Sequence, residues 1–180
     1  MKLMVINGSV RQGRASDKVQ SWAVDILKAD PELELDVVDL KEVDLPFFNE
    51  EVIPGNAHGQ FKNPNATAWA ARVAEAEAFI FITPEYNHGP TAVLKNAIDW
   101  VFEGWQFKPA GFISYGGIAA GTRAVQQLKQ NLLHLDVFPV HYNVHIPNIW
   151  NPDALDYPGL PDNLGKVVTD IKSLQKRLKI

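Results

Sequence analysis

The run Ala78-Phe79-Ile80-Phe81-Ile82-Thr83 limits the possible folds of this chain more than any other segment, because it is apolar on both of its alternating faces. Successive side chains of a strand point to opposite faces, so helices must cover such a strand above and below. This pattern is typical of a parallel sheet, whose right-handed crossovers build a doubly wound α/β domain. We therefore expect ligands to bind in the crevice beyond the carboxyl ends of the strands.

Apolar runs of strand length alternate with segments of helix length along the chain. We expect strands over residues 2–7, 33–40, 78–83, 110–115 and 138–146, and helices over about 16–29, 65–77, 91–103, 121–135 and 162–178. Segments 44–65 and 147–161 contain several prolines and little periodicity, which indicates loops, but no linker divides the chain. Since 180 residues is the size of one ordinary domain, we expect a single domain over residues 1–180.

Charge and composition exclude several classes of function. The net charge of −4 and the scattered lysines and arginines argue against a nucleic-acid partner. The chain has no cysteine, so it has no disulfide or thiolate, and redox chemistry requires a bound cofactor. The apolar run before Asn7-Gly8-Ser9 is too short for a signal peptide or a membrane span. We expect a cytoplasmic protein with no membrane partner.

The loop after the first expected strand, residues 8–16, is suited to a phosphate. It leads directly into a helix, and Ser9, Ser16 and Arg11 can donate hydrogen bonds to phosphate oxygens, with Arg14 adding charge nearby. The loop has neither the lysine of a Walker A motif nor the three-glycine dinucleotide spacing, so a monophosphate is favoured over a nucleoside triphosphate or a Rossmann-bound NAD. The alternative is that Ser16 only caps the helix and the arginines are solvated.

Two further loops are expected at the same edge of the sheet. In segment 83–90, two prolines and a glycine fix a shape whose main chain can bind the polar edge of a flat heterocycle. After the fourth strand, Gly116 and Gly117 allow the main chain to pass close to a ligand, and Tyr115 can contact a ring. The alternatives are an ordinary proline-containing turn and a glycine turn that ends a strand.

Together the three loops resemble the NADPH-dependent FMN reductase family of flavodoxin-like proteins, which includes quinone, azo-dye and chromate reductases. The similarity runs from residue 3 to about residue 146, with departures at Ala120 and in segments 17–18 and 88–91. Its motifs are Gly8-Ser9-Val10-Arg11, Pro84-Glu85-Tyr86-Asn87 with Leu94-Lys95-Asn96-Ala97-Ile98-Asp99-Trp100, and Tyr115-Gly116-Gly117 with Gly121-Thr122-Arg123. The resemblance implies a five-stranded parallel sheet of order 2-1-3-4-5 with helices on both faces, and FMN at its switch point.

The resemblance also implies which residues bind FMN. Those expected at the phosphate are Ser9, Arg11, Ser16 and, as a weaker assignment, Arg14; those expected along the isoalloxazine are Pro84, Glu85, Tyr86 and Asn87; those expected at its other side are Ser114, Tyr115, Gly116 and Gly117. No catalytic side chain is required, because the chemistry takes place at the N5 atom of the flavin.

The implied function is an oxidoreductase that passes hydride from NADPH, or NADH, to FMN and then to a quinone, free flavin, azo compound or metal ion by a ping-pong mechanism. The alternative is a flavodoxin-type electron carrier without NADPH turnover, which Arg11 and the modest net charge disfavour. A serine hydrolase is disfavoured because Ser9 lacks the Gly-x-Ser-x-Gly motif. A metal site at His141 and His145 lacks further ligands, so no metal is expected.

Aromatic residues raise the question of self-association. Four of them gather near the end of the third expected helix: Trp100, Phe102, Trp105 and Phe107. If they are exposed, a homodimer or homotetramer would bury them; the alternative is core packing within one chain. Dimers of the family commonly complete the flavin pocket, and the loop 45–63, with Phe47, Phe48 and Phe61, is a candidate for that contact.

Overall fold

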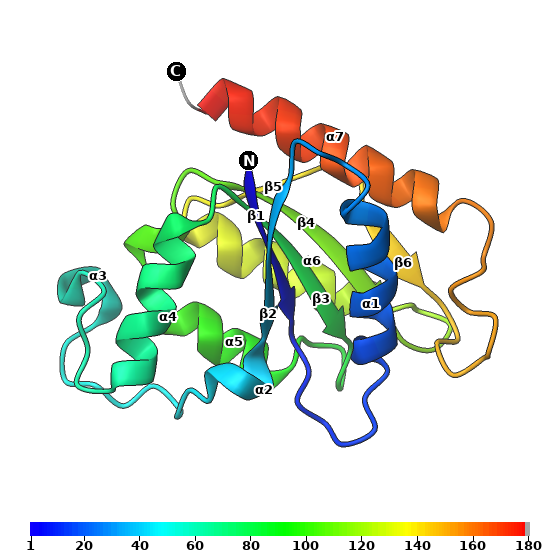
Figure 1. Ribbon diagram of the computed structural model, residues 1–180. Helices are drawn as coiled ribbons and strands as arrows, with labels where there is room; N and C mark the ends of the chain where they lie inside the picture. Colours follow the sequence, from blue (N-terminus) through cyan, green and yellow to red (C-terminus); the bar gives the residue numbers. More distant parts are fainter. Residues whose placement is uncertain (179–180) are drawn as a thin grey trace.

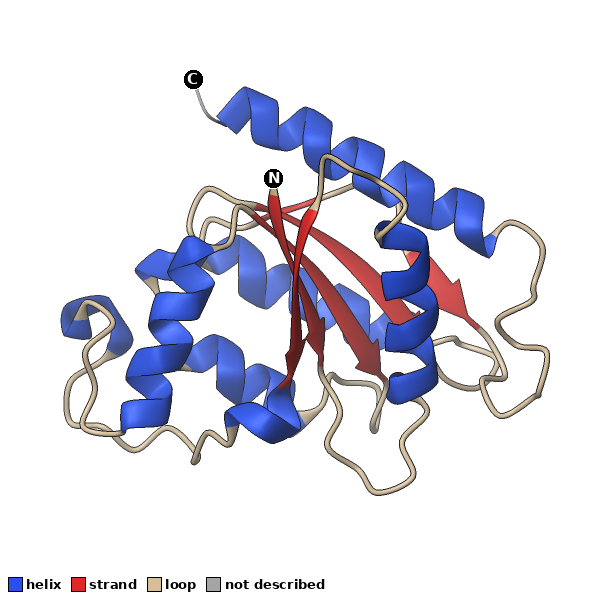
Figure 2. Cartoon of the chain, in the orientation of Figure 1, coloured by secondary structure: helices blue, strands red, loops and turns tan. Residues whose placement is uncertain are grey.

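The computed structural model describes residues 1–178 and shows a parallel sheet between two layers of helices (Figure 1). The strand order is β2-β1-β3-β4-β5, with β6 also paired to β4, which confirms the predicted flavodoxin-like order. The strands are β1 Lys2–Asn7, β2 Glu34–Asp39, β3 Ala78–Pro84, β4 Pro109–Tyr115, β5 Phe138–Pro139 and β6 Val144–Ile146. In Figure 2 the arrowheads of β1, β2 and β3 point to the same edge of the sheet.

Strand β3 explains the layering. All its residues are buried; Phe79 and Phe81 belong to one apolar cluster, and Ile80 and Ile82 belong to the cluster on the opposite face. Helices α4 Pro64–Glu75, α5 Ala92–Asp99 and α6 Thr122–His134 contribute to the first cluster, and α1 Ser16–Leu27 and α7 Leu160–Leu178 to the second. The short elements are α2 Leu40–Val43, α3 Pro54–Ala57 and η1 Glu103–Trp105. Burial on both faces is what the apolar run predicted.

The fifth strand differs from the prediction. The single strand expected over 138–146 is divided into β5 and β6, because β4 advances three residues between the pairs Ala110↔Pro139 and Ile113↔Val144 while the partner chain advances five. The extra residues leave the sheet, and His141 and Tyr142 are exposed there. His141 therefore does not share a strand with His145, and the described residues contain no cluster of three or more metal-binding side chains.

The third expected helix also ends earlier than predicted. Helix α5 stops at Asp99, and the separate helix η1 follows it, so the segment expected as one helix over 91–103 is interrupted. In the described part of the chain, no helix is both long and apolar enough to cross a membrane.

The aromatic residues near this helix have divided roles. Trp100 and Trp105 are fully buried within the chain, whereas Phe102 is partly buried and Phe107 is 62% exposed. Trp100 contacts Phe48 and Phe61 edge-on, with ring centroids 4.9 and 5.2 Å apart. The two tryptophans are thus core residues of one chain, as the core-packing alternative states.

Candidate cofactor site

A cavity of about 230 Å³ lies beyond the carboxyl ends of β1, β3 and β4, where the three predicted loops meet. Its lining residues are Ser9, Arg11, Arg14, Ala15, Pro84, Glu85, Tyr86, Tyr115, Gly116, Gly117, Ile149 and Trp150. Nine of the twelve residues expected to bind the cofactor are among them; Ser16, Asn87 and Ser114 are not. The fold therefore brings together motifs that lie far apart in the sequence.

The N-terminus of α1 has features of an anion site. Ala15 occupies the N-cap position, and no side chain of the described residues caps the first turn. The Oγ atom of Ser16, the first residue of the helix, is buried and has no hydrogen-bond partner among the described residues. An orphaned hydroxyl beside uncapped amides fits a phosphate, and Ser16 does not act as a simple helix cap.

Arg11 and Arg14 lie in different environments although both line the cavity. Arg11 is exposed and donates a hydrogen bond of 3.1 Å to the carbonyl of Gly13 in its own loop; no ion pair among the described residues includes it. The Arg14 side chain is only 9% exposed and forms ion pairs with Asp17 and Asp39. Burial opposes ionisation of Asp39, but the hydrogen bonds from Arg14 and the Lys41 amide and the positive charges of these two residues together outweigh it, so the pKa of this carboxyl is lowered.

The loop after β3 is shaped by a tight turn. Asn87 and His88 have positive φ values of 49° and 67°, and the main chains of Tyr86 and Gly89 exchange two hydrogen bonds of 2.9 Å. Positive φ at both central residues is typical of a type I′ turn. The turn holds Tyr86 at the cavity, with its hydroxyl 3.4 Å from Ser9 Oγ, whereas Asn87 lies at the exposed tip.

Glu85 connects the β3 loop to the start of α6. Its carboxylate is 8% exposed, accepts a hydrogen bond of 3.1 Å from the Arg123 amide and pairs with the Arg123 guanidinium. Burial of Glu85 raises its pKa, but the hydrogen bonds from Arg123 outweigh this effect, so the net pKa lies below the ordinary value. The carboxylate is therefore ionised at neutral pH and stabilises two of the loops that form the cavity.

We expect the Glu85→Gln variant to lose about 1–2 kcal/mol of unfolding free energy at pH 7. Because the folded-state pKa is lowered, the pair stabilises the protein above the ordinary value of about 4.3, and this contribution is lost as the pH falls through the lower folded value. Urea denaturation of both proteins between pH 7 and 3 should show a difference that shrinks below about pH 4. A difference that stays constant down to pH 3 would contradict the ion-pair assignment.

The loop after β4 approaches the cavity mainly through its main chain. A Cβ atom on Gly121 (φ +78°) would lie 2.9 Å from the Ser114 Cβ, so glycine is required for this turn. The Ser114 hydroxyl donates to the carbonyl of Ala120 at 2.6 Å and lies 2.7 Å from Nδ1 of His145, so it is engaged within the fold. Burial raises the pKa of Tyr115 to about 12, so its phenol is protonated at neutral pH.

The sequence interpretation missed Ala15, Ile149 and Trp150. Trp150 is 69% exposed and stands beside Gly117, where an added Cβ would lie 3.3 Å from the indole ring. Its loop is held by hydrogen bonds of 3.0 and 3.2 Å from the amides of Ile149 and Asn148 to the carbonyls of Gly116 and Gly117. The position of this loop in the sequence could have indicated its role. It follows the last expected strand, which lies next to the fourth strand, and therefore reaches the same edge of the sheet.

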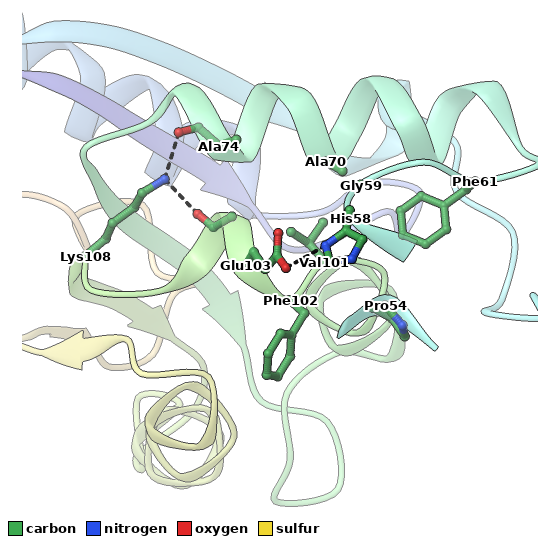
Figure 3. A pocket seen from close by; sticks show the side chains of 11 residues that line it. Pro54, His58, Gly59, Phe61, Ala70, Ala74, Val101, Phe102, Glu103 and Lys108 are labelled. Carbon is green, nitrogen blue, oxygen red and sulfur yellow. Dashed lines mark hydrogen bonds and ion pairs between the residues drawn. The ribbon is translucent and has the colours of Figure 1, made fainter. Parts of the chain in front are cut away.

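A second cavity, of about 320 Å³, lies near α3 and α4 and contains none of the predicted site residues (Figure 3). Its charged groups already have partners in the fold. Lys108 Nζ donates to the carbonyls of Val73 and Ala74 at 3.0 and 2.9 Å, and an oxygen of Glu103 lies 2.8 Å from His58 Nδ1. The cavity at the sheet edge, which has an orphaned hydroxyl and an uncapped helix beside it, is therefore the candidate cofactor site.

Comparisons with known proteins agree with this geometry. The family model of NADPH-dependent FMN reductase matches residues 1–151. An NAD(P)H-dependent FMN reductase of a Nectria species is 36% identical over 135 residues, which covers 73% of this chain and 67% of the relative. An NAD(P)H:quinone oxidoreductase of Solanum tuberosum is 33% identical over 141 residues, which covers 76% of this chain and 70% of the relative.

Among solved structures, the flavoenzyme NAD(P)H:(acceptor) oxidoreductase FerB from Paracoccus denitrificans has the same fold. It superposes with a TM-score of 0.77 at 24% identity, over 97% of each chain. The family match spans the three loops that form the cavity and every strand of the described sheet. The chain therefore belongs to the NADPH-dependent FMN reductase family, as an oxidoreductase that uses FMN as cofactor and NAD(P)H as substrate.

Proposed function

We propose that this protein holds FMN at the sheet-edge cavity and passes reducing equivalents from NADPH to a flat acceptor such as a quinone, with free flavins, azo compounds or metal ions as further candidates. The observation that carries the proposal is the meeting of nine predicted site residues beside an uncapped helix N-terminus. The potato relative, named as a quinone oxidoreductase, supports a quinone as acceptor.

In this proposal the phosphate group binds at the N-terminus of α1. Ser9, Ser16 and the exposed guanidinium of Arg11 donate to its oxygens, together with the free amides of the first turn. Ser16 thereby gains the partner that it lacks in the described structure. The negative charge would also interact favourably with the helix dipole.

The flavin ring is proposed to lie between the β3 and β4 loops. One side is lined by Pro84, Glu85 and Tyr86, which lead into the type I′ turn. The other side is lined by residues 115–117. Asn87, at the tip of the turn, and Ser114, whose hydroxyl is engaged, would contact the cofactor through main-chain atoms. Trp150 provides an exposed aromatic surface at the rim.

When bound, FMN supplies the centre that accepts hydride from NADPH and donates it to the acceptor. The chain itself binds and orients the ring. The cavity of about 230 Å³ is smaller than the roughly 300–1,000 Å³ typical of pockets that enclose a ligand, which supports a binding mode that leaves part of the ring uncovered. NADPH and acceptor would then occupy the same surface in turn, which is the structural basis for the proposed ping-pong order.

The proposal includes a homodimer or homotetramer. Phe47, in the loop 45–63, is 75% exposed and Phe107 is 62% exposed, so both present apolar area that a second copy would cover. The cytoplasmic location expected from the N-terminal sequence, and the preference for NADPH over NADH, stay predictions.

The FMN-loaded protein should lose its visible flavin absorbance when NADPH is added without oxygen and without a partner enzyme. A flavodoxin-type carrier would stay oxidised under these conditions, and free FMN with NADPH serves as the control. Steady-state rates with a quinone at several NADPH concentrations should give parallel double-reciprocal lines. Intersecting lines would contradict the ping-pong order while leaving the reductase activity intact.

A further inference from the structure

Arg14 joins three separate segments of the chain at the candidate phosphate loop. Its guanidinium donates to the main-chain carbonyl of Ser9, to Asp17 in the first turn of α1 at 2.7 Å, and to Asp39 at the end of β2 at 2.8 Å. The side chain is nine-tenths buried. A single buried cation therefore links the loop and the helix start to the neighbouring strand.

The donor groups of Arg14 are nearly all used by the protein. Of the five N–H groups of a guanidinium, Nε bonds to Asp17, the two of Nη1 bond to Ser9 and Asp39, and one of Nη2 bonds to Asp39. Two carboxylates also balance its positive charge. Arg14 is therefore poorly placed to act as a direct phosphate ligand, in contrast to the exposed Arg11.

The anchor for this cation, Asp39, belongs to the sheet. Asp39 pairs in register with Asn7, the last residue of β1. The Oδ1 atom of Asp39 also accepts a hydrogen bond of 2.9 Å from the amide of Lys41. The Asn7 side chain in turn accepts the amide of Ser9 at 3.3 Å. The start of the loop is thus held from β1 through Asn7 and from β2 through Arg14 and Asp39.

We propose that the Arg14–Asp39 ion pair is a positioning clamp that sets the geometry of the phosphate loop and thereby the preference for FMN over riboflavin. The inference rests on the proposed placement of the phosphate at the N-terminus of α1. Arg14 acts through the Ser9 main chain and the first turn of α1, so its loss misplaces donors that contact the phosphate. Riboflavin, which has no phosphate, depends only on the ring-binding loops.

The test compares Asp39→Asn with Asp36→Asn. Asp36 lies on the same strand and forms a similar ion pair of 2.6 Å with Arg72 of α4, which makes it a matched control away from the cavity. The dissociation constants of FMN and riboflavin are measured by quenching of flavin fluorescence, and the unfolding free energy of each variant is measured by urea denaturation. Asp39→Asn should weaken FMN binding at least about tenfold, and riboflavin binding less than about threefold. Asp36→Asn should leave the ratio of the two constants unchanged.

Other results of this experiment would contradict the clamp and favour a different role for Arg14. If Arg14 is itself a phosphate ligand, Asp39→Asn releases its guanidinium, and unchanged or tighter FMN binding would overturn the clamp. Equal weakening of both flavins would also overturn it, since it indicates a purely structural role. If Asp39→Asn does not fold, Asp39→Glu provides the same test, because glutamate keeps the charge and leaves Arg14 intact but displaces the carboxylate from the bidentate geometry. A wild-type protein that binds FMN no better than riboflavin would refute the phosphate placement itself, a failure distinct from that of the clamp.

Discussion

Replacing Trp100 by alanine is expected to lower the free energy of unfolding by about 3–5 kcal/mol. The side chain is fully buried, and its ring meets those of Phe48 and Phe61 edge-on. Its Nε1 donates to the carbonyl of Pro46 at 2.8 Å. The variant would leave a cavity beneath the loop 45–63 and remove one of the contacts that hold that loop, so urea denaturation should show the loss directly.

Two further variants make this prediction specific. Trp100→Phe fills most of the volume but lacks the indole donor, so it should cost less, about 1–3 kcal/mol. Trp150→Ala removes the same side chain type from an exposed position and should change stability by less than about 0.5 kcal/mol. A loss below about 1 kcal/mol for Trp100→Ala would show that the loop does not depend on this contact.

The same contacts change the interpretation of the Leu94–Trp100 motif. The Asn96 side chain accepts a hydrogen bond of 3.0 Å from the amide of Phe48 and donates one of 2.8 Å to the carbonyl of Pro46. Together with Trp100 it fixes the main chain of the loop after α2, and neither residue lines the cofactor cavity. In this chain the motif therefore maintains the fold around the site.

The Arg11→Ala variant is expected to weaken FMN binding by about 1.5–3 kcal/mol, which is about 10- to 150-fold in the dissociation constant. The reason is the loss of a charge-assisted hydrogen bond to the phosphate. Riboflavin binding and the unfolding free energy should hardly change, because Arg11 is exposed and its side chain donates a single hydrogen bond among the described residues, to the carbonyl of Gly13. Fluorescence titration with both flavins measures the effect.

Arg177→Ala on α7 is the matched control, since it removes another exposed arginine far from the cavity in the sequence. It should leave FMN binding unchanged. Arg11→Lys keeps the charge and should retain part of the affinity. If Arg11→Ala and Arg177→Ala bind FMN equally well, Arg11 is not a phosphate ligand.

The candidate site illustrates what a motif can and cannot predict. The three motifs placed eight residues at one cavity, because the carboxyl ends of parallel strands meet at one edge. The sequence ranked Arg14 below Arg11 but did not show that Arg14 pairs with Asp39, which only folding brings to it. Similarly, Ser16 and Ser114 are both buried serines, but among the described residues Ser114 meets a partner from another strand, His145, and the Ser16 hydroxyl meets none.

The sequence by itself determined the layered parallel fold. A strand such as β3, apolar on both faces, is stable only between two helical layers, and this requirement is local and independent of its partners. Only the tertiary structure decided the break between β5 and β6, the burial of Trp100 and Trp105, the ion pairs of Arg14 and the place of Trp150. These features depend on which residues meet although they lie far apart in the sequence. The pattern of apolar and polar positions predicts that a face is buried, but it does not predict which residues cover that face.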